Sequence, residues 1–362
     1  MERAVYRDVI FRRLRALDFR WFAGKGFTFV WLKLERYLKT GWAPAPLTCG
    51  VVVTENCNLR CPMCVLPVRY EKNPRMKDTS TMRKVLDNLH DLRIGGIALS
   101  GGEPTLRSDI FELLRHAGRN GTTVTLNSNM VSLTPEKIAA IATSGLDNVN
   151  VSIDSGDPAV NDQLRGGKKV LSRVLASIKA LAEERARLGT TFSITVVSTL
   201  SGLNLDEESL DALFRAVASC GADRLCFIPL HDIKDGVTFI PVQEKATPDL
   251  FERLQALARK HGVGLENSSR YLRAFYDVMS GGVMKELCNN GYTQLIIGDD
   301  LKIYRCIPFM NAGRPLFQWD PERQSLKELW NSREWRKDRK EALTCKQCFW
   351  DCHAELNFLV RM

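Results

Sequence analysis

The sequence predicts an α/β protein built on a parallel sheet that is closed, or partly closed, into a barrel. Six short apolar runs between residues 49 and 230 alternate with helical patterns. Each run has the length of a buried strand, and the segments between them can form crossover helices. Three cysteines follow the first run, and polar residues end the next three. Because sites on such sheets lie at the carboxyl ends of strands, we expect a site at this edge.

Each element of this fold has its own signal in the sequence. The strands are expected at residues 49–54, 96–100, 122–129, 148–154, 191–199 and 223–230. The helices are expected at residues 80–92, 107–119, 134–145, 168–188 and 206–220. Thr134 and Pro135 are typical of a helix start, and Gly145 of a helix end.

The strand–helix alternation stops after about residue 236. Helical patterns follow at residues 247–262 and 270–287, and a two-strand pattern at residues 292–306 has its turn at Gly298-Asp299-Asp300. At the other end, residues 1–40 show two helical apolar stripes. Their members are Ile10, Leu14, Leu17 and Trp21, then Phe27, Val30 or Trp31, Leu34 and Leu38. We expect the Gly-Lys-Gly at 24–26 to separate them.

Composition and charge narrow the class of protein. The chain has 362 residues, 44% hydrophobic and 26% charged, with a net charge of +9. Residues 1–47 hold ten Arg and Lys against four acids, so most of the excess lies outside the barrel and no nucleic-acid partner is expected. No apolar run has the roughly 18 residues of a membrane span, and the start lacks a signal-peptide pattern. We therefore expect a cytoplasmic protein.

The cysteines are numerous and clustered. Eleven are present, and Cys57, Cys61 and Cys64 stand at spacing C-x3-C-x2-C directly after the first strand. In a reducing compartment such clusters more often bind metal than form disulfides. Three thiolates leave one position of a four-ligand centre open. The alternative is a zinc site completed by a distant residue.

The segment CNLRCPMC, which spans these cysteines, resembles the signature of the radical S-adenosylmethionine (radical SAM) superfamily. The resemblance implies a partial (β/α)6 barrel in which Cys57, Cys61 and Cys64 hold a [4Fe–4S] cluster. It also implies that S-adenosylmethionine (SAM) chelates the fourth iron. Reductive cleavage of SAM would then give a 5′-deoxyadenosyl radical that abstracts a hydrogen atom from the substrate.

Other segments resemble the motifs that contact SAM in this family. SGGEP resembles the segment at the methionyl amine, LNSN and SID resemble segments near the ribose or carboxylate, and an arginine in NDQLRGG resembles one that pairs with the carboxylate. The residues implied are Ser100, Gly101, Gly102, Glu103, Asn127, Asn129, Ser152, Asp154 and Arg165. CFIPL, at residues 226–230, resembles the last strand beside the adenine. Cys226 is a possible hydrogen-atom donor, as in radical SAM epimerases.

The C-terminal cysteines resemble the SPASM/Twitch extensions that carry auxiliary [4Fe–4S] clusters. The resemblance implies one cluster held by Cys288, Cys306, Cys345 and Cys348. Cys352 departs from the pattern, as an alternate ligand or a buried thiol. Structural zinc is the alternative for the whole group.

Together these features predict four segments. They are a basic helical extension (1–46), the barrel (47–235), a helical connection (236–285) and a small α+β Twitch/SPASM-like domain (286–356). We expect a radical SAM enzyme of oxidoreductase type that oxidises or rearranges an unactivated C–H of a peptide, sugar or aminocyclitol, or lipid.

The alternatives are an epimerase and a non-catalytic iron–sulfur or zinc scaffold. The partners expected are a reductant such as flavodoxin or ferredoxin and, through residues 1–40, the periphery of a membrane.

Overall fold

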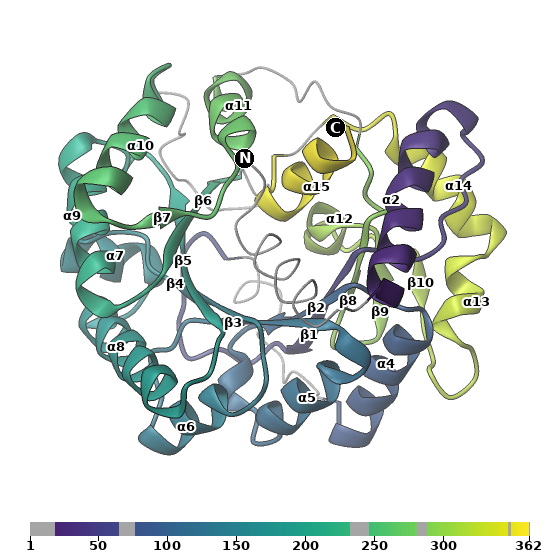
Figure 1. Cartoon of the computed structure of the whole chain (residues 1–362), viewed down its shortest axis with the longest axis horizontal. Helices are drawn as coiled ribbons and strands as arrows, with labels where there is room; N and C mark the ends of the chain where they lie inside the picture. Colours follow the sequence, from purple (N-terminus) through teal and green to yellow (C-terminus); the bar gives the residue numbers. More distant parts are fainter. Residues whose placement is uncertain (1–18, 65–76, 232–245, 281–287, 347–348, 362) are drawn as a thin grey trace.

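The computed structural model describes residues 19–64, 77–231, 246–280, 288–346 and 349–361. These residues form one curved sheet with helices outside it (Figure 1). The strand order is β10-β9-β8-β1-β2-β3-β4-β5-β6-β7, so β7 and β10 are edges and the barrel is not closed. The prediction of a partial α/β barrel is confirmed.

The first six strands are parallel and follow each other in space. Their bounds are β1 Thr48–Thr54, β2 Gly96–Gly101, β3 Thr123–Ser128, β4 Asn148–Ser152, β5 Ser193–Leu200 and β6 Arg224–Pro229. The connecting helices are α4 Thr79–Asp91, α5 Ile110–Ala117, α6 Pro135–Ala142, α7 Pro158–Arg165, α8 Val170–Leu188 and α9 Glu207–Cys220. Short 3₁₀ turns lie at Pro104–Leu106 and Arg119–Gly121.

The side chains along each strand alternate between two environments. In β3, Val124 and Leu126 are fully buried, whereas Thr123, Thr125 and Asn127 line the interior of the barrel. Successive side chains of a strand point to opposite faces, so one face packs on the outer helices and the other lines the lumen. The polar positions within the predicted strands are therefore the lumen positions.

The strands after the barrel extend the same sheet. β8 (Gln294–Ile297) pairs in parallel with β1, and β9 (Lys302–Tyr304) and β10 (Phe317–Gln318) continue antiparallel from it. The predicted two-strand unit thus forms, and it joins the barrel at β1. β7 (Gly264–Leu265) extends the opposite edge beside β6. The remaining helices here are α10 Leu250–His261, α11 Ser269–Met279, α12 Ile307–Asn311, α13 Leu326–Trp330 and α14 Arg333–Ala342.

The helix expected at 270–287 is present as α11 up to Met279, and residues 281–287 lie outside the described part.

The last helix, α15 (Asp351–Arg361), lies in the gap between the two sides of the open barrel (Figure 1). Glu355 Oε1 accepts from the Ser268 backbone N–H (2.8 Å) on the β7 side. Asn357 Oδ1 accepts from the Asn289 N–H (2.8 Å) on the β8 side. α15 therefore links the two flanks of the opening.

The N-terminal helix α2 (Phe19–Leu38) is continuous through residues 24–26, so the expected break at Gly-Lys-Gly is wrong. Two glycines cost a helix only about 2 kcal/mol, and packing along the rest of α2 outweighs that. Most of the first apolar stripe, including Ile10, Leu14 and Leu17, lies outside the described residues. Among the described helices, none is long and apolar enough to cross a membrane.

Candidate active site

The three-cysteine loop begins where β1 ends. Cys64 N–H donates to the carbonyl of Cys61 (3.0 Å), which folds the loop back on itself. Burial raises the pKa of the Cys61 thiol to about 11, and the nearby Cys64 and Cys57 thiols act in the same direction. In the described part of the chain, no group of three or more Cys, His, Asp or Glu side chains is arranged so that it could hold a metal ion.

Gly101 and Gly102 press against the backbone that leads into this loop. The N–H of Gly102 donates to the carbonyl of Thr54 (2.8 Å), and that of Glu103 to the carbonyl of Asn56 (2.7 Å). A Cβ on Gly101 would lie 2.1 Å from the Thr54 oxygen, and one on Gly102 would lie 2.3 Å from the Asn56 oxygen. Both positions therefore need glycine so that the end of β2 can support the cysteine loop.

Glu103 is fully buried and joins the ends of β2 and β3. Its Oε1 accepts from Thr105 N (3.0 Å), Thr105 Oγ1 (2.6 Å) and Ser128 Oγ (2.8 Å). Its Oε2 accepts from the Asn129 backbone N–H (2.6 Å). The carboxylate thus already has four protein donors, and only Oε2 keeps a lone pair for a further one.

Asn129 carries this network to the cysteine loop. Its Nδ2 donates to Asn58 Oδ1 (2.8 Å) and lies 3.8 Å from the sulfur of Cys57. Its Oδ1 accepts from the backbone N–H of Val131 (3.0 Å), which fixes the orientation of the amide. The end of β3 therefore positions the first cysteine of the loop.

Asp154 and Arg165 form a buried ion pair on the other side of the loop. Arg165 NH2 donates to Asp154 Oδ1 (2.6 Å), and Arg165 Nε lies 2.6 Å from Oδ2 in a contact that is not aligned as a hydrogen bond. Burial raises the pKa of Asp154, against the opposing effect of Arg165. The Cys61 thiol donates to the carbonyl of Arg165 (3.3 Å). The arginine expected to meet a SAM carboxylate thus has a carboxylate of the chain on two of its three nitrogens.

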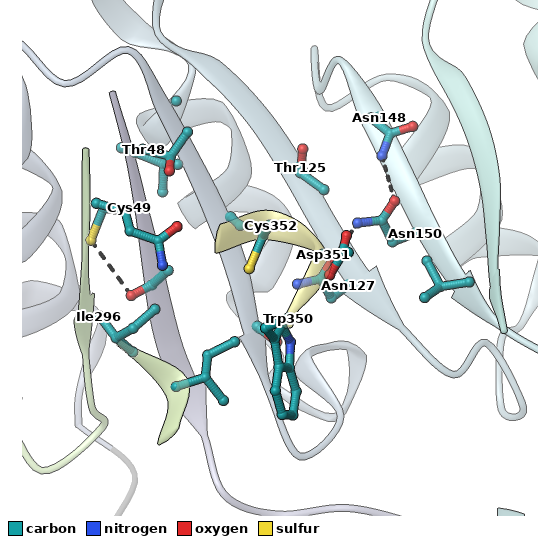
Figure 2. A pocket seen from close by; sticks show the side chains of 18 of the residues that line it. Thr48, Cys49, Thr125, Asn127, Asn148, Asn150, Ile296, Trp350, Asp351 and Cys352 are labelled. Atoms are coloured by element: carbon teal, nitrogen blue, oxygen red, sulfur yellow. Dashed lines mark hydrogen bonds between the residues drawn. The ribbon is translucent and has the colours of Figure 1, made fainter. Parts of the chain in front are cut away.

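A cavity of about 340 Å³ occupies the lumen beneath these segments. Figure 2 shows Thr125, Asn127, Asn148 and Asn150 on neighbouring strands around it. Ser100 and Ser152 also line it. Of the predicted SAM-contacting side chains, therefore, Ser100, Asn127 and Ser152 face open space, whereas Glu103 and Asp154 are enclosed by protein.

A chain of side-chain hydrogen bonds runs along the cavity wall. Thr195 Oγ1 donates to Asn148 Oδ1 (2.9 Å), Asn148 Nδ2 to Asn150 Oδ1 (2.7 Å), and Asn150 Nδ2 to Asn127 Oδ1 (2.8 Å). The row fixes the Asn127 amide with its oxygen engaged, so its Nδ2 is the end that is offered to a ligand. The Gln294 side chain on β8 also lines the cavity, and its Nε2 is buried without a hydrogen-bond partner.

The C-terminal helix adds residues to the cavity that the sequence did not identify as site residues. Trp350 and Asp351 line it together with Cys352 (Figure 2). The Trp350 ring stacks on His231 with centroids 4.6 Å apart, and burial lowers the pKa of His231. Adjacency to Cys352 is the one sequence signal for these residues.

The other cysteines lie in different surroundings. Cys288 and Cys306 are buried, Cys345 is half-buried, and Cys348 lies outside the described residues. Cys226 is 0% exposed and is not among the cavity-lining residues. Its thiol lies 3.7 Å from Asp351 Oδ2 and 3.5 Å from Asn267 Nδ2. Among the predicted cysteines that the structure describes, Cys352 is the one that lines the cavity.

Comparisons with known proteins agree with this geometry. A model of the radical SAM superfamily matches residues 51–217. The PqqA peptide cyclase of Ruegeria pomeroyi is 31% identical over 182 residues, which is 50% of this chain and 46% of that protein. The PqqA peptide cyclase of Methylobacterium nodulans is 34% identical with the same coverage. The chain spans about half the length of these curated relatives.

Solved structures show the same fold at low sequence identity. Streptococcus suis SuiB bound to S-adenosylmethionine has a TM-score of 0.66 at 17% identity, covering 84% of this chain and 70% of that one. The enzyme anSMEcpe with bound AdoMet has a TM-score of 0.58 at 16% identity, covering 81% and 82%. Residues 51–217 therefore form a radical SAM domain.

Proposed function

We propose that the chain is an enzyme that holds a [4Fe–4S] cluster on Cys57, Cys61 and Cys64 and oxidises or rearranges its substrate at an unactivated C–H bond. With SAM bound, the cluster would supply a 5′-deoxyadenosyl radical that removes the substrate hydrogen. One observation carries the proposal. The cysteine loop is fixed from three directions, by Gly102, by Asn129 and by Arg165, at the ends of strands whose side chains line the cavity.

The residues of the site divide into two groups in this proposal. Ser100, Asn127 and Ser152 face the cavity and are the side chains suited to contact SAM directly. Glu103 and Asp154 are enclosed, and they act through Asn129 and Arg165. The Glu103 and Asp154 carboxylates thus orient Asn129 and Arg165, and the planar Arg165 guanidinium suits the SAM carboxylate.

A peptide is the substrate class that the relatives support. PqqA peptide cyclases match the chain in sequence, and SuiB has been solved bound to its precursor peptide SuiA. The reductant would be a small electron carrier such as flavodoxin or ferredoxin. Reaction of oxidoreductase type fits an auxiliary cluster on Cys288, Cys306, Cys345 and Cys348, because such a cluster can accept an electron from a substrate radical.

Epimerisation is the second candidate, and the position of Cys352 favours it. A substrate carbon radical could take the hydrogen atom from the Cys352 thiol, which leaves a sulfur radical. One electron from the reductant and one proton from solvent would then restore the thiol. Cys226 is less suited to this role because Asp351 and Asn267 cover its thiol, which is 0% exposed.

Iron and sulfide analysis after anaerobic reconstitution tests the proposal. The wild type is expected to hold about eight irons, and the Cys57/Cys61/Cys64→Ala triple variant about four. With SAM and dithionite, the wild type should release 5′-deoxyadenosine and the triple variant none. An iron-loaded wild type that never cleaves SAM would instead be a scaffold.

A further inference from the structure

Helix α2 presents an apolar stripe to solvent. Phe27 is 55% exposed, Val30 56%, Leu34 48%, Tyr37 86% and Leu38 56%. Phe27, Val30, Leu34 and Leu38 follow one another at intervals of three or four residues, and Tyr37 is three residues after Leu34, so these side chains lie on one side of the helix. This is the second of the two stripes in the sequence, and it faces away from the protein. In Figure 1, α2 lies between α15 and α14.

The opposite side of α2 is firmly attached to the protein. Thr28, Leu32 and Glu35 are buried, and Leu32 belongs to the main core. Glu35 accepts hydrogen bonds from Thr40 Oγ1 (2.6 Å), from the Gly41 N–H and from Tyr292 OH (3.2 Å). These contacts fix the rotation of the helix about its axis. The exposure of the stripe is therefore a property of the fold.

The helix carries more positive than negative charge. Between residues 19 and 39 the sequence holds five basic residues and a single acid, Glu35. That acid is 2% exposed and engaged by three donors, so it does not face solvent. Lys39 is exposed and Lys33 is half-buried, with its Nζ 5.2 Å from the centre of the Phe29 ring. The exposed side of α2 is thus apolar, and the segment that carries it has an excess of basic residues.

We propose that α2 docks on the surface of an anionic lipid bilayer. In this arrangement the helix lies in the plane of the interface, with its stripe among the acyl chains and its lysines at the headgroups. The charge complementarity selects this occupant. A second copy of the chain would bring basic residues against basic residues, and a neutral lipid surface would leave the lysines without counter-charge.

Docking through α2 would bring the cavity close to the membrane. α2 contacts α15, and the first two residues of α15, Asp351 and Cys352, line the cavity. The substrate would therefore be met at the lipid surface. The proposal goes beyond the radical chemistry and does not depend on it.

Vesicle flotation with the reconstituted full-length protein tests this proposal. The wild type is expected to float with vesicles of phosphatidylcholine mixed with phosphatidylglycerol, less at high salt, and not with phosphatidylcholine alone. The double variant Val30→Glu/Leu34→Glu should lose binding by about tenfold or more, because both charges would enter the acyl region. The matched control Leu106→Glu/Leu188→Glu changes exposed leucines outside α2 and should bind like the wild type.

Iron content and the thermal unfolding midpoint confirm that both double variants are folded. Formation of 5′-deoxyadenosine without vesicles should be equal in all three proteins, which separates this proposal from the proposed reaction. Three results would overturn docking through α2. The first is a wild type that does not bind anionic vesicles. The second is a Val30→Glu/Leu34→Glu variant that binds them as tightly as the wild type. The third is a wild type that binds no lipid but forms a dimer, which the Val30→Glu/Leu34→Glu variant does not form.

Discussion

Arg165 and Asp154 are joined at two points, with Nε–Oδ2 and NH2–Oδ1 both 2.6 Å, in a site where Asp154 is 0% exposed. Asp154 Oδ1 also accepts from the backbone N–H of Thr199 on β5 (2.8 Å). The pair thus connects the ends of β4 and β5 to α7, whose last residue contacts Cys61. It supports the cysteine loop from the side opposite Glu103.

Replacing Asp154 with Ala would leave the Arg165 guanidinium buried without its partner. Loss of one member of a buried pair costs about 3–5 kcal/mol, so we expect the free energy of unfolding to fall by that amount. Denaturant unfolding under anaerobic conditions measures it. Glu184→Ala is the matched control, because it breaks the exposed Arg187–Glu184 pair and should change stability little. Equal unfolding midpoints for D154A and the wild type would contradict the supporting role of the pair.

Gly102→Ala tests whether the end of β2 holds the cysteine loop in place. The added methyl group would lie 2.3 Å from the Asn56 carbonyl, which must move and carry the loop with it. We expect G102A to retain clearly less iron than the wild type after reconstitution and gel filtration, with the auxiliary iron unchanged. In Gly118→Ala, the control, the new methyl would meet its neighbours at 3.7 Å or more. Full iron retention in G102A would show that the loop tolerates the displacement.

The sequence was sufficient for the barrel because its signals are local. Alternating strands and helices, a Thr-Pro helix start and glycine ends need no knowledge of distant contacts. The prediction at the Gly-Lys-Gly in α2 was wrong because the outcome there depends on distant contacts. Its two glycines disfavour a helix locally, but buried side chains such as Leu32 and Glu35 hold α2 against the protein. Tertiary packing outweighs local preference there.

Long-range pairings could not be predicted from the sequence. β8 joins the barrel by pairing with β1, about 240 residues earlier in the chain, and no local pattern encodes that choice. The surroundings of the Cys226 and Cys352 thiols could not be predicted from the sequence either. Cys226 lies on a strand that was predicted correctly, yet Asp351 and Asn267 cover its thiol, while α15 brings Cys352 into the cavity. The motifs identified Glu103 and Arg165, but not their partners within the chain.

Asp299 should give the protein a pH-dependent stability. Burial and a hydrogen bond to Glu55 raise the pKa of the Asp299 carboxyl to about 8. In the unfolded chain it titrates near 3.9, so between about pH 4 and pH 8 the folded state holds a proton that the unfolded state has released. The contribution of this proton to stability is therefore complete below about pH 4 and is lost as the pH rises through 8.

Asp299→Asn should remove this pH dependence, because an amide keeps its hydrogens at every pH. We expect the thermal unfolding midpoint of the wild type to fall from pH 6 towards pH 9 by more than that of D299N, as measured by anaerobic calorimetry. Asp320→Asn is the control, since Asp320 is exposed and is not among the groups that act on Asp299. Parallel curves for D299N and the wild type would mean that Asp299 is ionised in the folded protein.

Cys352 is expected to be a thiol of the cavity and not a cluster ligand. The Cys352→Ala variant should therefore keep the full iron content of the wild type, whereas Cys345→Ala should lose about four irons. Iodoacetamide labelling of the iron-loaded wild type, followed by peptide mass spectrometry, should modify Cys352, because it faces the lumen, before Cys226, which is enclosed. Loss of about four irons in C352A would make Cys352 a ligand.

SAM cleavage in heavy water then tests whether this thiol can quench a carbon radical. The thiol hydrogen exchanges with solvent, so without substrate a radical quenched at Cys352 gives 5′-deoxyadenosine that carries one deuterium. We expect this label in the wild type and in Cys226→Ala, and its loss in C352A. Mass spectrometry of the nucleoside reads the result. Label that persists in C352A, or that disappears in C226A, would assign the hydrogen donor elsewhere and remove the structural reason to consider epimerisation through Cys352.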